Sequence, residues 1–301
     1  MAIVTGGARG LGRCYVDMLA EQGASVVVND FGVELDGSGH SSTPTDETVR
    51  AIRDQGGKAV AAPFDVSTPD GGQAIVDTAL DAYGRVDLIV HNAGAGSTLQ
   101  QQLDIHLMGA FHVLQPLWPR LVEQEFGRVV LTTSSSALWS RPVPFVNGMP
   151  TDLGYATAKG GLIGLMHELA HLGEPHNIHV NAISPYGASR MNARFQGPSG
   201  DFGPELGAFF ANADPRQVAA VVCWLLHPDC TDTHAIFQAG GGKVSRVFIG
   251  ETVGWDSEPS ETSIEDVVAA WPMIEDRAGY REFETGYAEQ MWRVISARKR
   301  H

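Results

Sequence analysis

The segment Thr5–Gly12 constrains the fold of this chain more than any other feature. Its sequence, Thr-Gly-Gly-Ala-Arg-Gly-Leu-Gly, follows the short apolar run Ala2–Val4 and precedes a helical pattern over Arg13–Gln22. Between a strand and a helix, such glycines let the backbone approach a pyrophosphate, while the helix N-terminus supplies amide donors and a favourable dipole. The segment therefore predicts a nucleotide site that includes Gly6, Arg9, Gly10, Leu11 and Gly12.

Apolar runs and helical patterns alternate along the chain as far as Gly242. Apolar strands without polar alternation, each followed by a helix, are typical of a parallel sheet that is covered on both faces. The predicted class is α/β, a Rossmann-type doubly wound parallel sheet of about seven strands with helices on both faces. Further strands are expected at Ser25–Asn29, Lys58–Pro63, Val86–His91, Arg128–Thr133, Ile178–Ile183 and Ala235–Gln238, and further helices at Asp46–Gln55, Leu99–Gln124, Tyr155–Leu172 and Pro215–Leu226.

Asp30 indicates which dinucleotide the site prefers. It stands at the end of the second expected strand, 18 residues after Gly12. A carboxylate there accepts hydrogen bonds from ribose hydroxyls and repels a 2′-phosphate, which favours NAD over NADP. Arg9 points the other way, because a guanidinium beside the turn can hold a 2′-phosphate. We give Asp30 more weight, since a buried repulsion is harder to offset than a flexible arginine is to redirect.

The composition limits the classes of partner. The 301 residues contain 21 Lys and Arg against 35 Asp and Glu, a formal net charge of −14. An acidic chain whose basic cluster is the terminal Arg298-Lys299-Arg300 is a poor candidate for nucleic acid or an anionic membrane. No apolar run reaches the ~18 residues of a spanning helix, and no signal peptide is evident. Three cysteines without disulfide-framework spacing favour a reducing compartment, and we expect the cytoplasm.

The pair Tyr155 and Lys159 supplies candidate chemistry. Residues four apart lie on one face of a helix, one turn from each other. A phenol titrates near pH ~10, and a nearby positive charge favours its ionised form. Tyr155 could therefore exchange a proton with a substrate hydroxyl near neutral pH. Chance often produces this spacing, so the pair gains its meaning from the dinucleotide site that precedes it.

Taken in order, these motifs resemble those of the short-chain dehydrogenase/reductase family. The glycine-rich turn and the Tyr155–Lys159 pair are joined by Asp65-Val66, Asn92-Ala93-Gly94, Ser134 and Pro185-Tyr186-Gly187, each after a strand. The resemblance covers about residues 2–242. It implies that Asp65 and Val66 flank an adenine. It also implies that the remaining cofactor contacts come from Asn92, Ala93, Gly94, Pro185, Gly187, Ala188 and Ser189.

The resemblance also implies a reaction, the transfer of a hydride between a secondary alcohol or ketone and NAD. Tyr155 would be the acid/base, and Lys159 would lower its pKa and hold the nicotinamide ribose. Ser134 would bind the substrate oxygen, with Ser135 or Ser136 as alternatives within the same serine run. The chain would then be an NAD(P)-dependent alcohol dehydrogenase or ketone reductase.

A narrower resemblance concerns the substrate. Phe111–Ser134, Asn177–Asn181 and Gly187–Met191 are similar to the dehydrogenase domain of peroxisomal multifunctional enzyme type 2. That enzyme type oxidises (3R)-3-hydroxyacyl-CoA and, in some members, 17β-hydroxysteroids. The resemblance therefore implies a 3-hydroxyacyl thioester or a hydroxysteroid as the substrate.

Two departures from the family pattern fall around the substrate. His106 replaces the usual Asn, which acts largely through its main-chain carbonyl, so His106 is either a relay or a structural residue at a helix bend. Ser134 and Tyr155 are 21 positions apart, more than is usual, and the 12 positions from Gly94 to His106 are fewer than in related enzymes. Ligands bind at the carboxyl ends of parallel strands, so we expect the extra stretch Arg141–Pro150 to form a pocket wall.

Two other functions deserve comparison. His167-Glu168-Leu169-Ala170-His171 fits the His-Glu-x-x-His pattern of zinc hydrolases. It continues the helix of Tyr155, and Pro175 interrupts the helix before any further histidine, so we predict no metal site. The other alternative is an NAD-binding regulator or scaffold that has lost catalysis.

The chain is expected to form one catalytic domain with a C-terminal extension. Residues 1–242 are expected to form the catalytic domain, and residues 243–301 an extension with a helix at Glu282–Ala297 that packs on the same domain or on a partner subunit. The helix Leu99–Gln124 carries a wide apolar surface, and family members usually pair through such helices. A homodimer or homotetramer is therefore expected. That surface comprises Leu107, Phe111, Leu114, Leu117 and Trp118.

Overall fold

The computed structural model describes residues 1–139, 145–146, 149–150, 153–187, 204–256, 262–283 and 285–298. The chain divides into two compact units, Met1–Arg246 and Val247–His301. The boundary expected after Gly242 falls inside a β-hairpin of the first unit, because β9 (Ile236–Gly240) and β10 (Lys243–Val247) are neighbouring strands.

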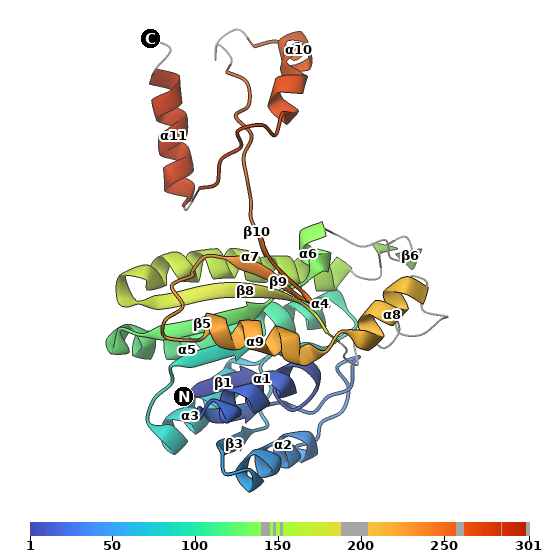
Figure 1. Cartoon of the computed structure of the whole chain (residues 1–301), viewed down its shortest axis with the longest axis vertical. Coiled ribbons are helices and arrows are strands. Elements are labelled where there is room, and N and C mark those ends of the chain that lie inside the picture. The colour runs from blue at the N-terminus through green and yellow to red at the C-terminus, as the bar shows by residue number, and fades with distance from the viewer. Residues whose placement is uncertain are drawn as a thin grey trace. The chain divides into compact units, whose positions relative to one another are not determined.

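An eight-stranded sheet, in the order β10-β9-β8-β5-β4-β1-β2-β3, forms the centre of the first unit (Figure 1). Seven of its strands, from β9 to β3 in this order, are parallel to one another, which confirms the expected doubly wound sheet. The eighth, β10, was not predicted. It follows a two-residue turn at Gly241-Gly242, a connection that joins antiparallel strands. The other strands are β1 (Ala2–Thr5), β2 (Ser25–Asn29), β3 (Lys58–Ala62), β4 (Leu88–His91), β5 (Gly127–Thr132) and β8 (Ile178–Tyr186).

The strand order reverses between β1 and β4, and this reversal places the site. From β1 the chain proceeds outward through β2 and β3, and from β4 it proceeds through β5, β8 and β9 to the other edge. The carboxyl ends of β1 and β4 therefore diverge into different loops, and ligands bind in the crevice at such a point.

Helices cover both faces of the sheet, which explains the strands' continuous apolar character. On one face α1 (Gly10–Glu21) packs against α9 (Pro215–Leu225), and on the other α3 (Pro69–Tyr83) packs against α5 (Gly109–Gln124) (Figure 1). Every residue of β1 and of β5 is buried as a result. The remaining helices of this unit are α2 (Thr43–Asp54), α4 (Leu99–Gln102), α6 (Ser135–Trp139), α7 (Leu153–Gly173) and α8 (Pro204–Asn212), with a 3-10 turn η2 (Glu174–His176).

The expected helix Leu99–Gln124 is interrupted, and this part of the prediction was wrong. A π-helical turn, η1 (Leu103–Met108), separates α4 from α5. The wider turn shifts the helical register and carries His106 at its centre. Single π-turns of this kind occur frequently at functional sites.

The described residues of the second unit include two helices, α10 (Ile264–Glu275) and α11 (Gly286–Arg298). The helix expected at Glu282–Ala297 corresponds to α11, whereas α10 was missed. Its signal was present, because Ser263 and Asp266 form a capping box at its N-terminus. Within the part of the chain that the structure describes, no helix is long and apolar enough to cross a bilayer.

Candidate active site

The glycine-rich turn meets the loop after β4 by direct backbone contact. Gly6 and Gly10 have positive φ, at 62° and 55°. A Cβ on Gly6 would lie 2.8 Å from the Cα of Ala93, a distance that side-chain carbons do not adopt. The Asn92 amide donates to the carbonyls of Thr5 and Gly6, at 3.3 and 3.1 Å. The two loops therefore form one rigid floor, which a side chain on Gly6 would force apart.

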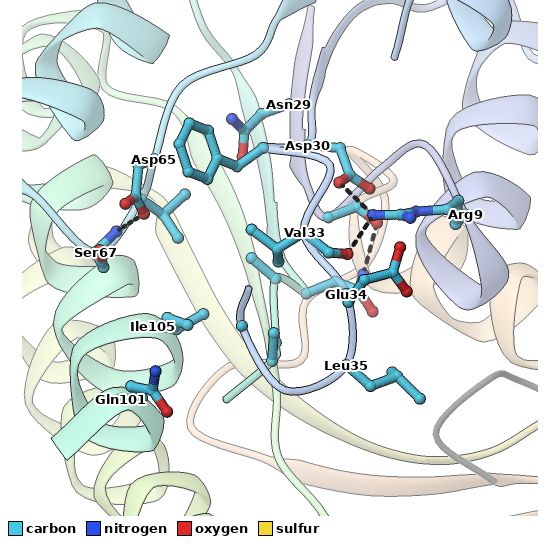
Figure 2. A pocket seen from close by; sticks show the side chains of 18 of the residues that line it. Arg9, Asn29, Asp30, Val33, Glu34, Leu35, Asp65, Ser67, Gln101 and Ile105 are labelled. Atoms are coloured by element: carbon cyan, nitrogen blue, oxygen red, sulfur yellow. Dashed lines mark hydrogen bonds and ion pairs between the residues drawn. The ribbon is translucent and has the colours of Figure 1, made fainter. Parts of the chain in front are cut away.

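A cavity of about 310 Å³ opens above this floor (Figure 2). The walls include the residues after β2 and β3 and the first turns of α4 and η1. Four carboxylates line it, from Asp30, Glu34, Asp65 and Asp104, and Arg9 is the one cation among the described lining residues. Ten residues expected at a cofactor line this cavity: Gly6, Arg9, Gly10, Leu11, Asp30, Asp65, Val66, Asn92, Ala93 and Gly94.

The loop after Asp30 also lines the cavity, a contribution that was not predicted. Its lining residues are Phe31, Val33, Glu34, Leu35 and Gly37. One signal could have identified it, because βα connections usually have 2–6 residues and longer ones are often functional.

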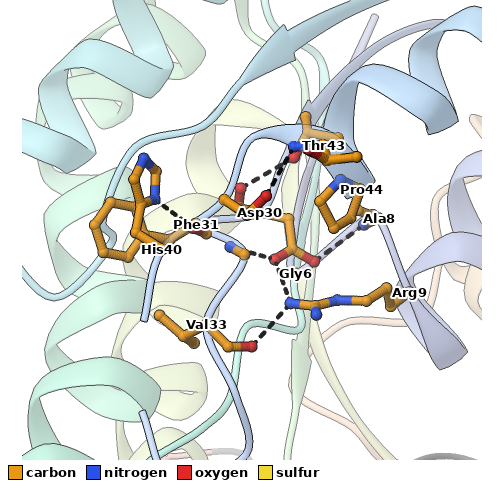
Figure 3. Close-up of polar contacts among 12 residues, drawn as sticks. Gly6, Ala8, Arg9, Asp30, Phe31, Val33, His40, Thr43 and Pro44 are labelled. Atoms are coloured by element: carbon orange, nitrogen blue, oxygen red, sulfur yellow. Dashed lines mark hydrogen bonds and ion pairs between the residues drawn. The ribbon is translucent and has the colours of Figure 1, made fainter. Parts of the chain in front are cut away.

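Asp30 and Arg9 bind each other rather than acting against each other (Figure 3). The guanidinium of Arg9 donates to the Asp30 carboxylate at 3.2 Å and to the Val33 carbonyl at 3.0 Å. The same carboxylate accepts the backbone N–H of Gly32 at 2.8 Å and that of Ala8 at 3.3 Å. Asp30 thus ties the glycine-rich turn to the loop that follows β2, and Arg9 is held where it neutralises that carboxylate.

Tyr155 and Lys159 occupy the first turns of α7. The Lys159 side chain is buried, and its ammonium donates to the carbonyl of Thr132 at 2.5 Å. Thr133 in turn donates to the Lys159 carbonyl at 2.9 Å, so β5 and α7 hold each other at this point. Burial lowers the pKa of Lys159 to about 7. Its Nζ lies 5.8 Å from the centroid of the Tyr155 ring, as the four-residue spacing predicted.

His106 lies beside this pair. Its side chain is 1% exposed, and its ring centroid is 5.3 Å from that of Tyr155, with the rings nearly perpendicular. Neither ring nitrogen has a hydrogen-bond partner among the described residues. Burial, followed by the charges of Lys159 and His91, holds the pKa of His106 well below its usual range. A Cβ on Gly94 would overlap the imidazole, so the ring packs directly against the cavity's backbone wall.

His91 fixes the main chain behind His106. Its Nε2 lies 3.0 Å from the His106 carbonyl and its Nδ1 lies 3.0 Å from the Thr5 hydroxyl. A carbonyl only accepts, so Nε2 carries the proton and Nδ1 of the neutral ring accepts from Thr5. The Thr5 oxygen can then accept the N–H groups of Asn92 and Ala93, both at 3.1 Å. Burial lowers the pKa of His91 to about 3, which keeps this arrangement neutral.

The other expected site residues are only partly within the described chain. Ser134 follows β5 and its hydroxyl accepts the Ser136 N–H at 3.2 Å. Pro185 lies in β8, and a Cβ on Gly187 would be 2.9 Å from the Leu11 side chain, so this segment reaches the glycine-rich turn. Ala188 and Ser189 lie outside the described residues. So does the stretch Arg141–Pro150, except for β6 (Phe145–Val146) and β7 (Met149–Pro150), which pair as antiparallel strands.

The His-Glu-x-x-His segment lies along α7 and points elsewhere. The His167 Nδ1 is 2.5 Å from Nε2 of His234, a contact between two imidazoles, and His171 is exposed. Among the described residues, no group of three or more His, Cys, Asp or Glu is arranged to hold a metal ion.

Comparison with known proteins identifies the family. The family model for short chain dehydrogenases matches residues 1–196. The chain belongs to the short-chain dehydrogenase/reductase family. It is 41% identical, over 289 residues, to a short-chain type dehydrogenase/reductase of Mycobacterium tuberculosis. The aligned region covers 92% of this chain and 94% of the relative.

The expected similarity to peroxisomal multifunctional enzyme type 2 is confirmed. The mouse enzyme is 34% identical over 264 residues, which is 84% of this chain and 33% of that enzyme. The solved structure of the full-length Drosophila melanogaster enzyme superposes with a TM-score of 0.75 and 27% identity, covering 99% of this chain and 49% of that one. The chain thus matches only one part of those longer proteins.

The site fits the nicotinamide cofactors that this family uses. The cavity floor is bare backbone at Gly6 and Gly94, where a phosphate or ribose must come close. Behind Gly94, the two buried ring nitrogens of His106 have no hydrogen-bond partner among the described residues. A dinucleotide would supply the phosphate and ribose that the bare backbone of the floor admits.

Proposed function

We propose that this chain is an NAD-dependent oxidoreductase that transfers a hydride between a secondary alcohol or ketone and nicotinamide. One observation carries the proposal. Gly94 lines the same cavity as Asp30 and the glycine-rich turn, and it packs against His106, whose ring centroid lies 5.3 Å from that of Tyr155. A dinucleotide in that cavity would bring its reactive end to a phenol with a buried lysine beneath it.

Three residues have separate roles in the proton transfer. A bound nicotinamide would accept or supply the hydride. In the oxidation direction, Tyr155 takes the proton of the substrate hydroxyl and returns it in the reverse direction. Lys159 in its charged form favours the ionised phenol. Ser134, at the end of β5, donates a hydrogen bond to the substrate oxygen and stabilises the charge that develops there.

His106 acts in this proposal as a positioning residue rather than as a structural histidine. A residue that only filled space at the bend would not place two unpaired polar atoms at a buried site, since such atoms destabilise the fold. The neutral imidazole can donate from one nitrogen and accept at the other. It can therefore orient a polar group that reaches its ring, which lies between Gly94 and Tyr155.

The charges around the cavity favour NAD over NADP. The carboxylate of Asp30 would repel a 2′-phosphate, and the side chains of Glu34, Asp65 and Asp104 add negative charge to the same cavity. A 2′-phosphate brought into this cavity would meet four carboxylates and one cation. That cation, Arg9, is already paired with Asp30.

The substrate class rests on the relatives. Two of them are named as peroxisomal multifunctional enzymes type 2, and we propose a 3-hydroxyacyl thioester or a hydroxysteroid as the substrate. We also propose a homodimer or homotetramer formed through α5 and α7, where Phe111 and Leu172 are exposed. The competing proposal is an NAD-binding regulator without turnover.

Formation of NADH from a panel of secondary alcohols tests the proposed reaction. The wild-type protein should produce NADH with at least one 3-hydroxyacyl thioester or hydroxysteroid. Tyr155→Phe should bind NAD with unchanged affinity and lose turnover, because only the acid/base hydroxyl is removed. A wild-type protein that binds NADH and oxidises no member of the panel would favour the regulator.

A further inference from the structure

Phe31 forms a flat wall of the cavity. It is the first residue after Asp30, it is half-buried, and it lines the cavity together with Val66 and Ile105. These three side chains are apolar, and the carboxylates of Asp30, Glu34, Asp65 and Asp104 line the same cavity. A planar aromatic group in this cavity could therefore contact the Phe31 ring as well as the aliphatic side chains of Val66 and Ile105.

His40 backs this wall from outside the cavity. Its imidazole stacks on the Phe31 ring with centroids 4.2 Å apart and planes inclined by 29° (Figure 3). Phe31 is among the residues that line the cavity, whereas His40 is not.

A hydrogen bond fixes His40 as well. Its Nδ1 lies 2.6 Å from the carbonyl of Phe31, and the same carbonyl accepts the N–H of Ser41 at 3.3 Å. The carbonyl can only accept, so Nδ1 carries a proton. His40 thus holds both the ring and the main chain of Phe31.

The fold of the loop makes this return possible. Gly32 has a φ of 76°, and a Cβ at that position would overlap the carbonyl of Ser41. The backbone at Gly32 therefore lies so close to that at Ser41 that no side chain fits at position 32. This narrow neck brings His40 back beneath Phe31, although nine positions separate the two residues in sequence.

We propose that His40 is a positioning residue that holds the Phe31 ring in place as a stacking surface for a purine base. The inference rests on the proposed function, since the purine is that of an adenine dinucleotide. Stacking on an aromatic side chain is tolerant of base identity, and a ring that is already ordered loses less freedom on binding. His40 supplies that order in the absence of ligand.

Binding of AMP, measured by calorimetry on the full-length protein, tests the proposal. Phe31→Ala should weaken AMP binding by roughly 5- to 150-fold, the range found for loss of base stacking. His40→Ala should weaken it by roughly 2- to 12-fold, because one side chain must then be ordered on binding. His40→Phe keeps the stack and should bind AMP more tightly than His40→Ala. His227→Ala is the matched control, since His227 is also exposed and stacks on Trp224, and it should leave AMP binding unchanged.

Kinetics separate positioning from a general loss of structure. His40→Ala should raise KM for NAD and leave kcat at saturating NAD unchanged, with a thermal midpoint close to that of the wild type. Unchanged AMP affinity in either Phe31→Ala or His40→Ala would overturn the inference. So would an equal loss of kcat and AMP affinity in His40→Ala. A wild-type protein that binds neither AMP nor NAD would instead refute the proposed function.

Discussion

Replacing Asp30 by alanine should shift cofactor preference toward NADP. The Arg9–Asp30 pair is shielded from solvent, with side chains 25% and 10% exposed and 3.2 Å between nitrogen and oxygen. At an effective dielectric constant of ~20, two unit charges 6–8 Å apart interact by about 2–3 kcal/mol. The substitution changes the charge of the site by one unit and leaves Arg9 without its partner. The ratio of NADPH to NADH dissociation constants should therefore fall by roughly 30- to 100-fold.

Fluorescence titration with NADH and NADPH measures this ratio. The Asp30→Ala/Arg9→Ala double variant should lose most of the gain, because the released guanidinium supplies the attraction for the 2′-phosphate. Asp36→Ala is the control, since it removes the same charge from an exposed position of the same loop. The reasoning is refuted if Asp30→Ala leaves the ratio unchanged, or if the double variant keeps the full gain.

Three other substitutions test the interior of the site. Gly94→Ala should reduce turnover and NADH affinity about tenfold through overlap with His106, whereas Gly160→Ala, whose Cβ meets nothing within 4 Å, should change neither in steady-state assays. In the His91→Asn variant, the urea midpoint of unfolding should decrease less steeply as the pH is lowered. The pKa of His91 is lowered from 6.5 to about 3, so stability that is fully present above pH 6.5 is lost toward pH 3, by at most ~1.4 kcal/mol per pH unit; an unchanged slope would contradict this. Lys159→Met should abolish turnover yet raise the calorimetric midpoint. The wild-type chain must bury an ammonium whose pKa is lowered from 10.5 to about 7. The gain in stability of the variant should therefore be largest below pH 7 and vanish above pH 10.5. A gain that increased with pH would contradict this expectation.

Local features of the sequence predicted the frame of the site well. The glycines of Thr5–Gly12 have few uses between a strand and a helix, and the structure places them in a turn at the switch point of the sheet. Tyr155 and Lys159 lie on one turn of α7 because the spacing of a helix is fixed. Such features depend on neighbours in sequence, so a single chain is enough to predict them.

Features that depend on distant contacts were not predictable in the same way. The apolar pattern of Leu99–Gln124 gives no sign of the π-turn η1, because one widened turn leaves the pattern almost intact. The pairing of Arg9 with Asp30 joins residues 21 positions apart, and the sequence presented them as competitors. By contrast β10 was missed despite a local signal, the Gly-Gly hairpin turn before it.

The replacement of Asn by His106 becomes intelligible once His91 is considered with it. In the family pattern the main-chain carbonyl at this position is the active group, and any residue would supply one. Here that carbonyl lies 3.0 Å from Nε2 of His91, which donates to it. The imidazole of His106 meanwhile lies beside Tyr155 with both nitrogens unpaired among the described residues. The carbonyl oxygen keeps a second lone pair, and the imidazole adds a donor and an acceptor at the same bend. Substitution of His106 should therefore affect this chain more than substitution of a residue that acts only through its carbonyl.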